Sequence, residues 1–289
     1  MIKYILLLLL LIPLPFIQGE PNPPERVEIY FCPEEDCEAV FLENINKNSK
    51  CAFYSLQKES IKKKLNEENV LVESSNHNDF GKSVDVEGLM HHKFCVTENK
   101  VITGSANPTP GDLYENNNNI LVIESEDIAF NYIEEYKSLT GTEPSYKPSS
   151  IVKVHFCPRH NCKNIIKNIL MQAEDSIYFL TFTFTDQEIA KILAYKHNEG
   201  LEVKGVVDSF QNPAYWTVPL LEKNNVRHRI NKGNLQHNKL FVVDEATVIT
   251  GSYNPTRAAH TINKENIIVI QSKEIANIYK EQSLKIYEE

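Results

Sequence analysis

The apolar positions of the chain follow two periods, which together predict strands and helices in alternation. Runs such as 27–31, 151–156 and 201–208 are typical of strands that are covered on both faces. Apolar residues spaced three or four positions apart predict helices at 37–47, 58–69, 127–138, 162–173, 186–198 and 273–287. This alternation favours an α/β fold, in which helices cover a mixed sheet.

The same order of elements occurs twice. The similar segments are 27–45 with 152–170, 49–56 with 175–182, 101–109 with 248–256, and 117–125 with 265–273. A repeat of this kind predicts two units of one fold. We therefore expect two pseudo-twofold related α-β-α sandwich halves with mixed sheets, at 26–142 and 151–289, joined by a linker at 143–150.

The segment before the repeats is of a different kind. Lys3 precedes an apolar run at 4–17, which is short for a membrane span and contains two prolines. We expect 1–19 to be a signal peptide or an uncleaved N-terminal anchor, and 20–25 to be a Pro-rich linker. Both alternatives predict that the folded part is secreted or extracytoplasmic, and the second adds a membrane anchor.

The 289-residue chain has six cysteines, an even number that fits an oxidising compartment. Four of them form two identically spaced pairs, Cys32 with Cys37 and Cys157 with Cys162. This spacing predicts two local disulfides. A zinc site at the second pair, completed by His155 and His160, is the alternative. Cys51 and Cys95 lie in apolar runs and are either buried thiols or a third bridge.

Polar residues flank one apolar strand of the second half. In HNKLFVV, His237 and Lys239 project from one face, because residues two apart in a strand point the same way. This pair is typical of a phosphate site, where lysine supplies charge and histidine a nucleophile or proton carrier. Asp244 and a Gly-Ser-x-Asn turn follow, and Ser252 and Asn254 can offer further donors to an oxyanion.

An imperfect copy of this pattern lies in the first half. His91, Lys93, Ser105 and Asn107 occur in the same order, but Glu98 stands where Asp244 would be. One His-x-Lys pair is most often a solvated strand edge. Two copies, each followed by the same turn, are not expected by chance.

The double motif resembles the His-Lys-Asp signature of the phospholipase D superfamily over nearly the whole chain after the N-terminal segment. The motif sequences are similar to those of small secreted bacterial endonucleases and of the mitochondrial cardiolipin hydrolase group. The resemblance implies a two-step mechanism without a metal or cofactor, in which one histidine attacks phosphorus and the other protonates the leaving oxygen. The resemblance also implies roles for the residues of the two motifs. The catalytic residues would be His91, His237, Lys93 and Lys239. The phosphate-binding residues would be Ser105, Asn107, Ser252 and Asn254, and the supporting residues would be Glu265, Asp244 and Glu98.

A downstream glutamate orients the motif histidine in this family, and Glu265 has the fitting place after His237. Asn118 aligns with Glu265 in the first half, so His91 would lack a carboxylate unless Glu115 replaced it. A carboxylate partner fixes the tautomer and raises the basicity of a histidine. Our hypothesis from the sequence is therefore that His237 is the nucleophile and His91 the general acid.

The sequence does not determine which phosphodiester is the substrate. The net charge of −9 argues against a chain that grips nucleic acid over its whole surface. Arg227, His228, Arg229 and Lys232 nevertheless form a basic segment before the second motif, and 210–220 could touch a membrane or stack a base. We expect a hydrolase of phospholipid headgroups; the alternatives are an exported endonuclease and a non-catalytic phosphate binder. We also expect a monomer that contains a fused internal dimer.

Overall fold

The computed structural model describes residues 25–149, 151–210 and 217–289. The predicted signal peptide or anchor lies outside the described residues, as do the N-terminal linker apart from Glu25 and the middle of segment 210–220. Among the helices of the described ranges, none is long and apolar enough to cross a membrane.

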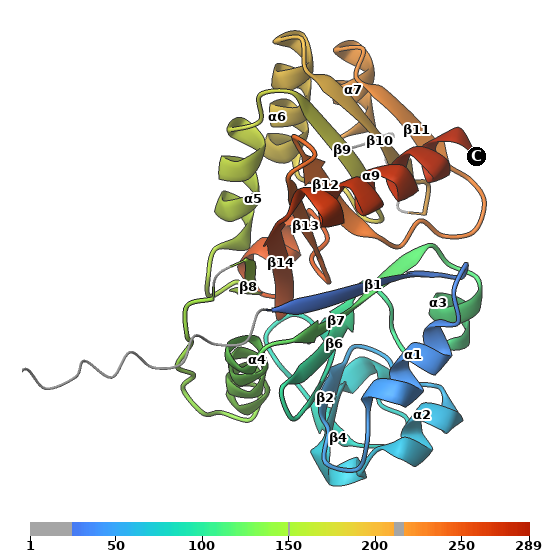
Figure 1. The fold of residues 1–289 in the computed structure, drawn as a ribbon, viewed down its shortest axis with the longest axis vertical. Coiled ribbons are helices and arrows are strands. Elements are labelled where there is room, and N and C mark those ends of the chain that lie inside the picture. The colour runs from blue at the N-terminus through green and yellow to red at the C-terminus, as the bar shows by residue number, and fades with distance from the viewer. Residues whose placement is uncertain (1–24, 150, 211–216) are drawn as a thin grey trace, which may run out of the picture.

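Each half is built around a seven-stranded mixed sheet (Figure 1). The first sheet has the order β1 (Arg26–Cys32), β7 (Asn118–Glu124), β6 (Lys100–Gly104), β5 (Lys93–Thr97), β2 (Lys50–Phe53), β3 (Val70–Glu73) and β4 (Lys82–Val84). The second has the order β8 (Val152–Cys157), β14 (Glu265–Gln271), β13 (Thr247–Gly251), β12 (Lys239–Val243), β9 (Ser176–Thr181), β10 (Glu202–Asp208) and β11 (Arg227–Asn231). The two orders correspond strand by strand, so the predicted fold class of two related halves is confirmed.

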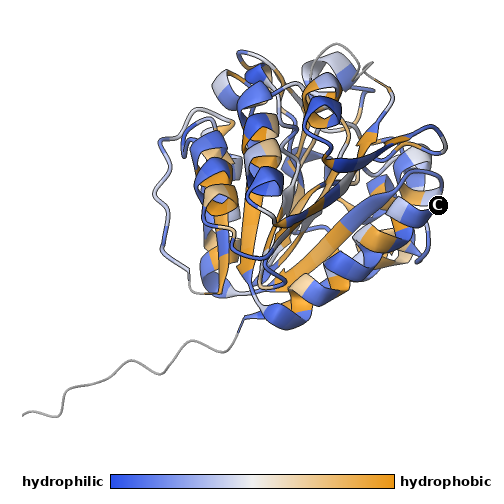
Figure 2. Cartoon of the chain, turned by 90° about the horizontal axis from the view of Figure 1, so that it is seen from above, coloured by the Kyte–Doolittle hydropathy of each residue, from blue (hydrophilic) through white to orange (hydrophobic). Residues whose placement is uncertain are grey.

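Helices cover both sheets. The first half has α1 (Cys37–Asn44), α2 (Glu59–Lys64), α3 (Pro110–Tyr114) and α4 (Glu126–Ser138). The second has α5 (Cys162–Met171), α6 (Gln187–Asn198), α7 (Val218–Lys223), α8 (Arg257–Thr261) and α9 (Lys273–Glu288). Figure 2 shows the hydrophobic residues gathered on the strands, with hydrophilic residues on the outer faces of the helices.

The largest apolar cluster joins the two halves. It contains Phe94 and Leu240 of the central strands, together with Tyr132 of α4 and Tyr279 of α9. Two further clusters lie under the outer helices of the second and first halves. Because burial of apolar surface is the main favourable term in folding, the shared cluster holds the halves in a fixed relation. That relation positions the site described below.

The predicted helix at 58–69 is wrong in its length. Helix α2 ends at Lys64, and a separate 3₁₀ turn runs over Glu67–Asn69. Leu65, between them, is fully buried in an extended conformation, and the Asn66 side chain accepts the N–H of Glu68. Burial of one leucine and a local cap therefore outweigh the helical spacing of this segment.

Strand pairing also corrects the alignment of 49–56 with 175–182. In the sheets, Phe53 and Thr181 each lie opposite the motif lysine of their own half. The alignment of these segments is therefore wrong by two residues. Apolar positions alone do not fix strand register when a strand is buried on both faces.

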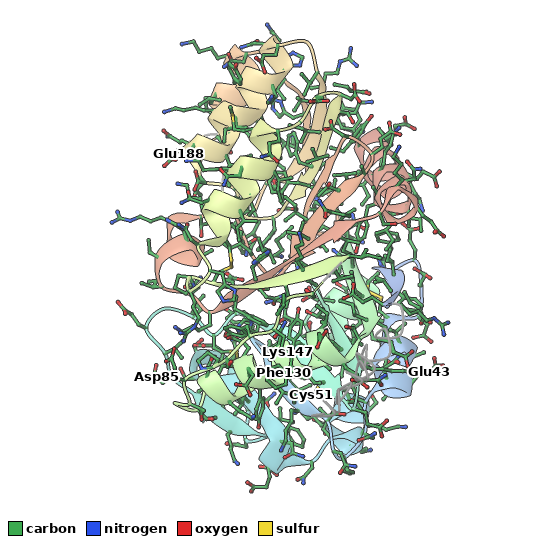
Figure 3. All side chains as sticks on the ribbon, turned by 60° about the vertical axis from the view of Figure 1, so that its left-hand side comes forward. Glu43, Cys51, Asp85, Phe130, Lys147 and Glu188 are labelled. Atoms are coloured by element: carbon green, nitrogen blue, oxygen red, sulfur yellow. A yellow bond between two sulfur atoms is a disulfide. The ribbon has the colours of Figure 1, made fainter. Side chains whose placement is uncertain are left out.

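The connection between the halves is fastened to α4. The side chain of Asn131 exchanges hydrogen bonds of 2.9 and 2.7 Å with the backbone of Lys147, and the Tyr146 hydroxyl donates to Glu135 (2.6 Å). The Lys147 ammonium lies 4.4 Å from the ring centre of Phe130, and both are labelled in Figure 3. We keep 26–142, 143–150 and 151–289 as proposed domain and linker bounds.

Three disulfides are present among the described residues, and they join Cys32 to Cys37, Cys157 to Cys162, and Cys51 to Cys95. The two local bridges are as predicted. The third joins neighbouring strands β2 and β5 at facing positions. The zinc alternative at the second pair is wrong, because both of its sulfurs are bonded to each other.

The Cys51–Cys95 bridge should contribute most to stability. It closes a loop of 44 residues, whereas each local bridge spans 5. In the loop-entropy model, removal of the Cys51–Cys95 bridge lowers the free energy of unfolding by roughly 4 kcal/mol, and removal of one local bridge lowers it by roughly 2 kcal/mol. Denaturant unfolding of Cys51→Ala/Cys95→Ala measures the first, and Cys32→Ala/Cys37→Ala is the matched control. An equal loss in both double variants would contradict the prediction.

Candidate active site

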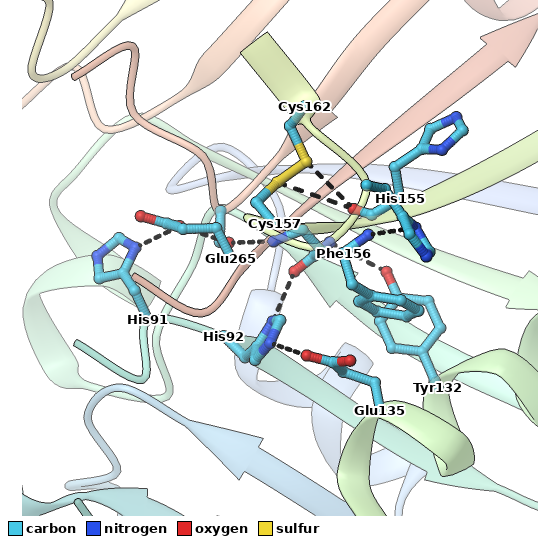
Figure 4. Close-up of a disulfide and its surroundings, with 12 residues drawn as sticks. His91, His92, Tyr132, Glu135, His155, Phe156, Cys157, Cys162 and Glu265 are labelled. Atoms are coloured by element: carbon cyan, nitrogen blue, oxygen red, sulfur yellow. Dashed lines mark hydrogen bonds and ion pairs between the residues drawn. A yellow bond between two sulfur atoms is a disulfide. The ribbon is translucent and has the colours of Figure 1, made fainter. Parts of the chain in front are cut away.

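His91 precedes β5 and is held by the second half of the chain. Its N–H donates to the Lys264 carbonyl (2.8 Å), and the Lys264 N–H donates to the Leu89 carbonyl (2.7 Å). This bridge places the next residue, Glu265, beside the histidine. His91 Nδ1 lies 2.8 Å from Glu265 Oε2. A dashed line marks this contact in Figure 4. The carboxylate favours the Nδ1–H tautomer, which leaves the Nε2 lone pair free.

His237 precedes β12 and is held by the first half in the equivalent way. Its N–H donates to the Asn117 carbonyl, and the Asn117 N–H donates to the Leu235 carbonyl, both at 2.9 Å. The bridge places Asn118 beside the ring, and His237 Nδ1 lies 2.8 Å from Asn118 Oδ1. Each half therefore supplies the residue that orients the histidine of the other half.

These contacts overturn the predicted partner of Glu265. The sequence hypothesis placed it on His237, in the same half, whereas its carboxylate contacts His91. Glu115, the suggested substitute for His91, is exposed at the end of α3. The sequence repeat shows which positions of the two halves are equivalent. It does not show that a residue of one half contacts the histidine of the other half.

The turn that follows each motif requires glycine. Gly104 and Gly251 have φ angles of 141° and 135°, and a Cβ there would lie 2.2 Å and 2.4 Å from the carbonyl oxygens of Asn119 and Asn266. Only glycine adopts this conformation at such close approach. The following serine in each half is thereby brought against the neighbouring strand.

The two turn serines do not face a phosphate. The hydroxyl of Ser252 donates to Glu265 (2.7 Å), and that of Ser105 donates to Asn118 (2.8 Å). Each hydroxyl oxygen also accepts a backbone N–H of the neighbouring strand. Because the single hydrogen of each hydroxyl is already used, we revise the predicted phosphate-binding role of both serines. They hold the residues that orient the histidines.

Each local disulfide lies behind one of these orienting residues. Glu265 pairs with Cys157 across β14 and β8, and Asn118 pairs with Cys32 across β7 and β1. The Cys157–Cys162 bridge and Glu265 appear together in Figure 4. The bridges therefore fix the strand ends from which the orienting side chains project.

The motif lysines are fully buried beside their histidines. Lys93 Nζ donates to the carbonyl of His91 (2.7 Å), and Lys239 Nζ makes the same contact with His237. Each ammonium lies 5.1 Å from an aromatic ring centre, Tyr54 for Lys93 and Phe182 for Lys239. These rings also lie 4.8 Å from the histidine rings. Sequence reasoning missed both, because the alignment error of two residues hid that they correspond.

The two motif asparagines have different surroundings. Asn107 Nδ2 donates to the buried Asp112 carboxylate (2.7 Å), which the sequence analysis did not single out. Asn254 Oδ1 accepts the Thr183 N–H (3.3 Å), and Asn254 lines the cleft described next. The Asn254 amide group is thereby oriented with its NH₂ available for an oxyanion.

The remaining predicted residues lie at the far ends of the motif strands. Asp244 follows β12 and accepts the backbone N–H groups of Glu174, Asp175 and Ser176 at 2.8–3.1 Å. Glu98 is exposed in the turn between β5 and β6. Each of the two residues has a positive φ angle in its turn, and neither lines the cleft described below.

Both motif histidines open into one cleft of about 500 Å³ between the halves. Its walls include Tyr54 and Leu89 from the first half, and Phe182, Phe210 and Arg257 from the second. The cleft thus combines two imidazoles, apolar walls and a basic side chain at the first turn of α8.

The comparisons with known proteins agree with this geometry. A family model described as "Cardiolipin synthase, PLD-like domain" matches residues 38–140 and 166–286, one segment in each half. The chain belongs to the phospholipase D superfamily. The predicted family is therefore confirmed, and the family is one of phosphodiester hydrolases, the enzyme class that the two motifs predicted.

Individual relatives match about half of the length of this phospholipase D-like chain. A protein named "Phospholipase D" from Rickettsia felis is 32% identical over 152 residues, which is 50% of this chain and 76% of the relative. A "Mitochondrial cardiolipin hydrolase" from Xenopus laevis is 30% identical over 157 residues, 52% of this chain and 73% of the relative. The crystal structure of a phosphatidylserine synthase from Haemophilus influenzae covers 89% of this chain and 85% of its own, with a TM-score of 0.69 and 15% identity, and shares the fold.

Burial controls the charge of the phospholipase D-like site. It lowers the pKa of His91, an effect that Glu265 opposes, so His91 is neutral at neutral pH. Burial also resists ionisation of Glu265, but the contact with His91 outweighs it and lowers the pKa of the carboxyl. Burial and the nearby Lys239 also lower the pKa of His237, and Asp112 acts in the opposite direction. The neutral His91 beside an ionised carboxylate is suited to nucleophilic attack.

Anion affinity should fall as the pH passes through the pKa of Lys93. Burial lowers that pKa to about 8. The ammonium is charged below this value and neutral above it, so dimethyl phosphate, an anion of constant charge, should bind more weakly above about pH 8. Calorimetric titration across this range measures the change. Lys93→Arg should remove the step, while the exposed Lys100→Arg should keep it; a wild-type affinity that is constant with pH would contradict the assignment.

Proposed function

We propose that the chain is a metal-independent phosphodiesterase of phospholipase D type, which hydrolyses the headgroup ester of a phospholipid through a phosphohistidine. The observation that carries the proposal is the pair of histidines in one cleft, each oriented by the opposite half. Two imidazoles on opposite sides of one phosphate allow in-line displacement. The site is complete within one chain, which supports an active monomer.

In the first step, His91 Nε2 attacks phosphorus. Burial lowers the pKa of His237 in the free site, whereas Asp112 and the bound phosphodiester anion favour the protonated ring from which the reaction starts. The Nε2–P bond forms, the bond from phosphorus to the leaving oxygen breaks, and the leaving oxygen takes a proton from His237 Nε2. The ring of His91 becomes positively charged, and the Glu265 carboxylate at 2.8 Å stabilises that charge. Lys93, Lys239 and the amide of Asn254 hold the phosphate oxygens.

In the second step, water replaces the histidine. His237 Nε2, now neutral, accepts a proton from water as the oxygen attacks phosphorus. The Nε2–P bond then breaks and returns the electron pair to His91. The two buried lysines supply the positive charge that a metal ion supplies in other phosphodiesterases.

This division of roles reverses the hypothesis drawn from the sequence. Nucleophilic attack places a positive charge on the attacking imidazole, so the nucleophile needs the stronger anionic partner. His91 has the carboxylate of Glu265 at 2.8 Å, whereas the nearest partner of His237 is the neutral amide of Asn118. We therefore assign His91 as the nucleophile and His237 as the general acid and base.

A phospholipid is the substrate that these observations favour. Phe210 is 64% exposed and stacks on Phe182, which gives the cleft an apolar edge. Arg257 offers a positive charge to a lipid phosphate at that edge. The net charge of −9 opposes general affinity for nucleic acid. The names of the two relatives and the three disulfides support an exported enzyme that acts on lipid.

Substrate choice is tested by incubating the protein, in EDTA, with phosphatidyl lipid vesicles and with single- and double-stranded DNA and RNA. We expect headgroup release from the lipid and no cleavage of nucleic acid, with His91→Ala as the inactive control. Cleavage of nucleic acid without lipid turnover would replace the lipid proposal with a nuclease. Loss of all activity in EDTA, restored by metal, would contradict the metal-free mechanism, and specific anion binding without turnover would indicate a non-catalytic binder.

A further inference from the structure

The halves differ at two paired positions near the histidines. Asn118 and Glu265 each follow the turn glycine by 14 residues, while Asp112 and Ala259 each follow it by 8. All four are buried. The second half thus has a carboxylate at the later position and alanine at the earlier one. The first half has the carboxylate at the earlier position and an amide at the later one.

The Asp112 carboxylate is held in the site by several hydrogen bonds. Its Oδ2 accepts the backbone N–H and the side-chain Nδ2–H of Asn107 (2.9 and 2.7 Å), and its Oδ1 accepts from Asn116 Nδ2 (3.0 Å). The same Oδ1 lies 3.6 Å from His237 Nδ1. Burial opposes ionisation of the group, but His237, Asn116 and Asn107 together lower its pKa, so it is an anion at neutral pH.

The other groups that act strongly on His237 disfavour its protonation. Lys239 lies beside it in the same half, Lys93 and, when protonated, His91 belong to the opposite half, and burial has the same effect on the imidazolium. Among the described groups that act on this ring, Asp112 is the acid. A general acid must carry its proton when the leaving oxygen departs, so this carboxylate sits where the proposed chemistry needs one.

We infer that Asp112 is the positioning residue of His237 and keeps its imidazolium available as the general acid, the counterpart of what Glu265 does for His91. The inference rests on the proposed division of roles between the two histidines. In the first half, Asn118 occupies the strand position that Glu265 has in the second half, and the carboxylate lies on α3. It reaches the ring beside the amide rather than in place of it.

The alternative is a purely structural role, in which Asp112 holds Asn107 and α3. Two substitutions separate these roles. Asp112→Ala removes the carboxylate. Asp112→Ala/Asn118→Glu gives the first half the pattern of the second, since Glu265 occupies the equivalent place and accepts from its turn serine in the same way. The double variant restores a carboxylate to His237 but not the contacts to Asn107.

The activity test compares two diesters across pH, one with an alkyl leaving group and one with a p-nitrophenolate leaving group, which needs no proton. Asp112→Ala should lower kcat for the alkyl diester about 10- to 100-fold and move the basic limb of its pH profile to lower pH. The p-nitrophenyl diester should change much less. The double variant should recover most of the loss and return the limb. Equal losses on both diesters, or no recovery in the double variant, would show that Asp112 acts only as a support.

A measurement without turnover keeps the inference separate from the proposed function. The pKa of His237 is followed by NMR of ring-labelled histidine, assigned with His237→Gln. It should fall in Asp112→Ala and rise again in the double variant, even if no diester tested is a substrate. An unchanged pKa in folded Asp112→Ala would overturn the inference, whatever the activity. A shifted pKa in a protein without phosphodiesterase activity would instead refute the proposed function.

Discussion

Replacing His91 with alanine is expected to lower kcat on the order of 10⁴-fold or more, because the variant has no atom to form the bond to phosphorus. The proposed mechanism divides one difficult displacement into two steps, and both pass through His91 Nε2. Neither Glu265 nor His237 can take over, since the carboxylate is oriented toward the ring it would replace and His237 is on the other side of the cleft. Steady-state kinetics on a lipid and on a p-nitrophenyl diester measure the loss. Both substrates should lose activity equally, because a better leaving group does not replace a nucleophile.

The matched control is His228→Ala. His228 lies on β11, outside the walls of the cleft, and its Nδ1 contacts the Val226 carbonyl (2.8 Å). Its replacement should leave kcat unchanged and show that loss of a histidine as such is harmless. Substantial activity of His91→Ala on the p-nitrophenyl diester, with an unchanged melting temperature, would refute the assignment of His91 as nucleophile.

The fold could be predicted from the sequence because its signals are local. Helices such as α5 and α9 bury a face whose spacing is visible in the residues themselves, and the repeat shows that two units share one topology. The failures occur where a tertiary contact overrides spacing. Leu65 ends α2 because it is buried in an extended conformation, and no local pattern shows that.

The candidate site was predicted in composition but not in its connections. His91, His237, Lys93 and Lys239 are motif residues, and the structure brings them to one place. The exchange of Glu265 to His91 could not be predicted, because it follows from a backbone bridge between residues of different halves. A sequence repeat identifies equivalent positions in the two copies, but it contains no information on how the copies contact each other.

Asp112, the carboxylate near His237, could not be predicted from the repeat either. In the first half, Asn118 occupies the position equivalent to Glu265, and the sequence indicates Glu115 as a substitute carboxylate. Glu115 is exposed in the structure, whereas Asp112, three residues earlier, is buried. Residues three apart on a helix share a face, but Glu115 lies just past the end of α3, where the backbone leaves the helical conformation, and its side chain is exposed. The first half, which holds the imperfect copy of the motif, has its carboxylate at a different position.

Replacing His237 with alanine should affect the two diesters very differently. For a lipid or alkyl diester, the variant lacks the proton donor of the first step, and kcat should fall about 10²- to 10⁴-fold. For the p-nitrophenyl diester, the leaving group departs without a proton, so the first step continues through His91. The second step still lacks a base for water. The phospho-enzyme should therefore accumulate, and stopped-flow absorbance should show a burst of nitrophenolate equal to the enzyme concentration, followed by slow turnover.

The position of the trapped phosphoryl group decides between the two assignments of roles. Quenching the His237→Ala reaction in alkali, followed by peptide mass spectrometry, should locate phosphate on His91. Glu265→Gln in the same background should reduce the burst rate, since the carboxylate stabilises the charge that develops on His91 during attack. If the burst is instead absent from His237→Ala and present in His91→Ala, then His237 is the nucleophile. The Asn118 amide, together with the more distant Asp112 carboxylate, would in that case be a sufficient partner, and the closer anionic contact would not determine which histidine attacks.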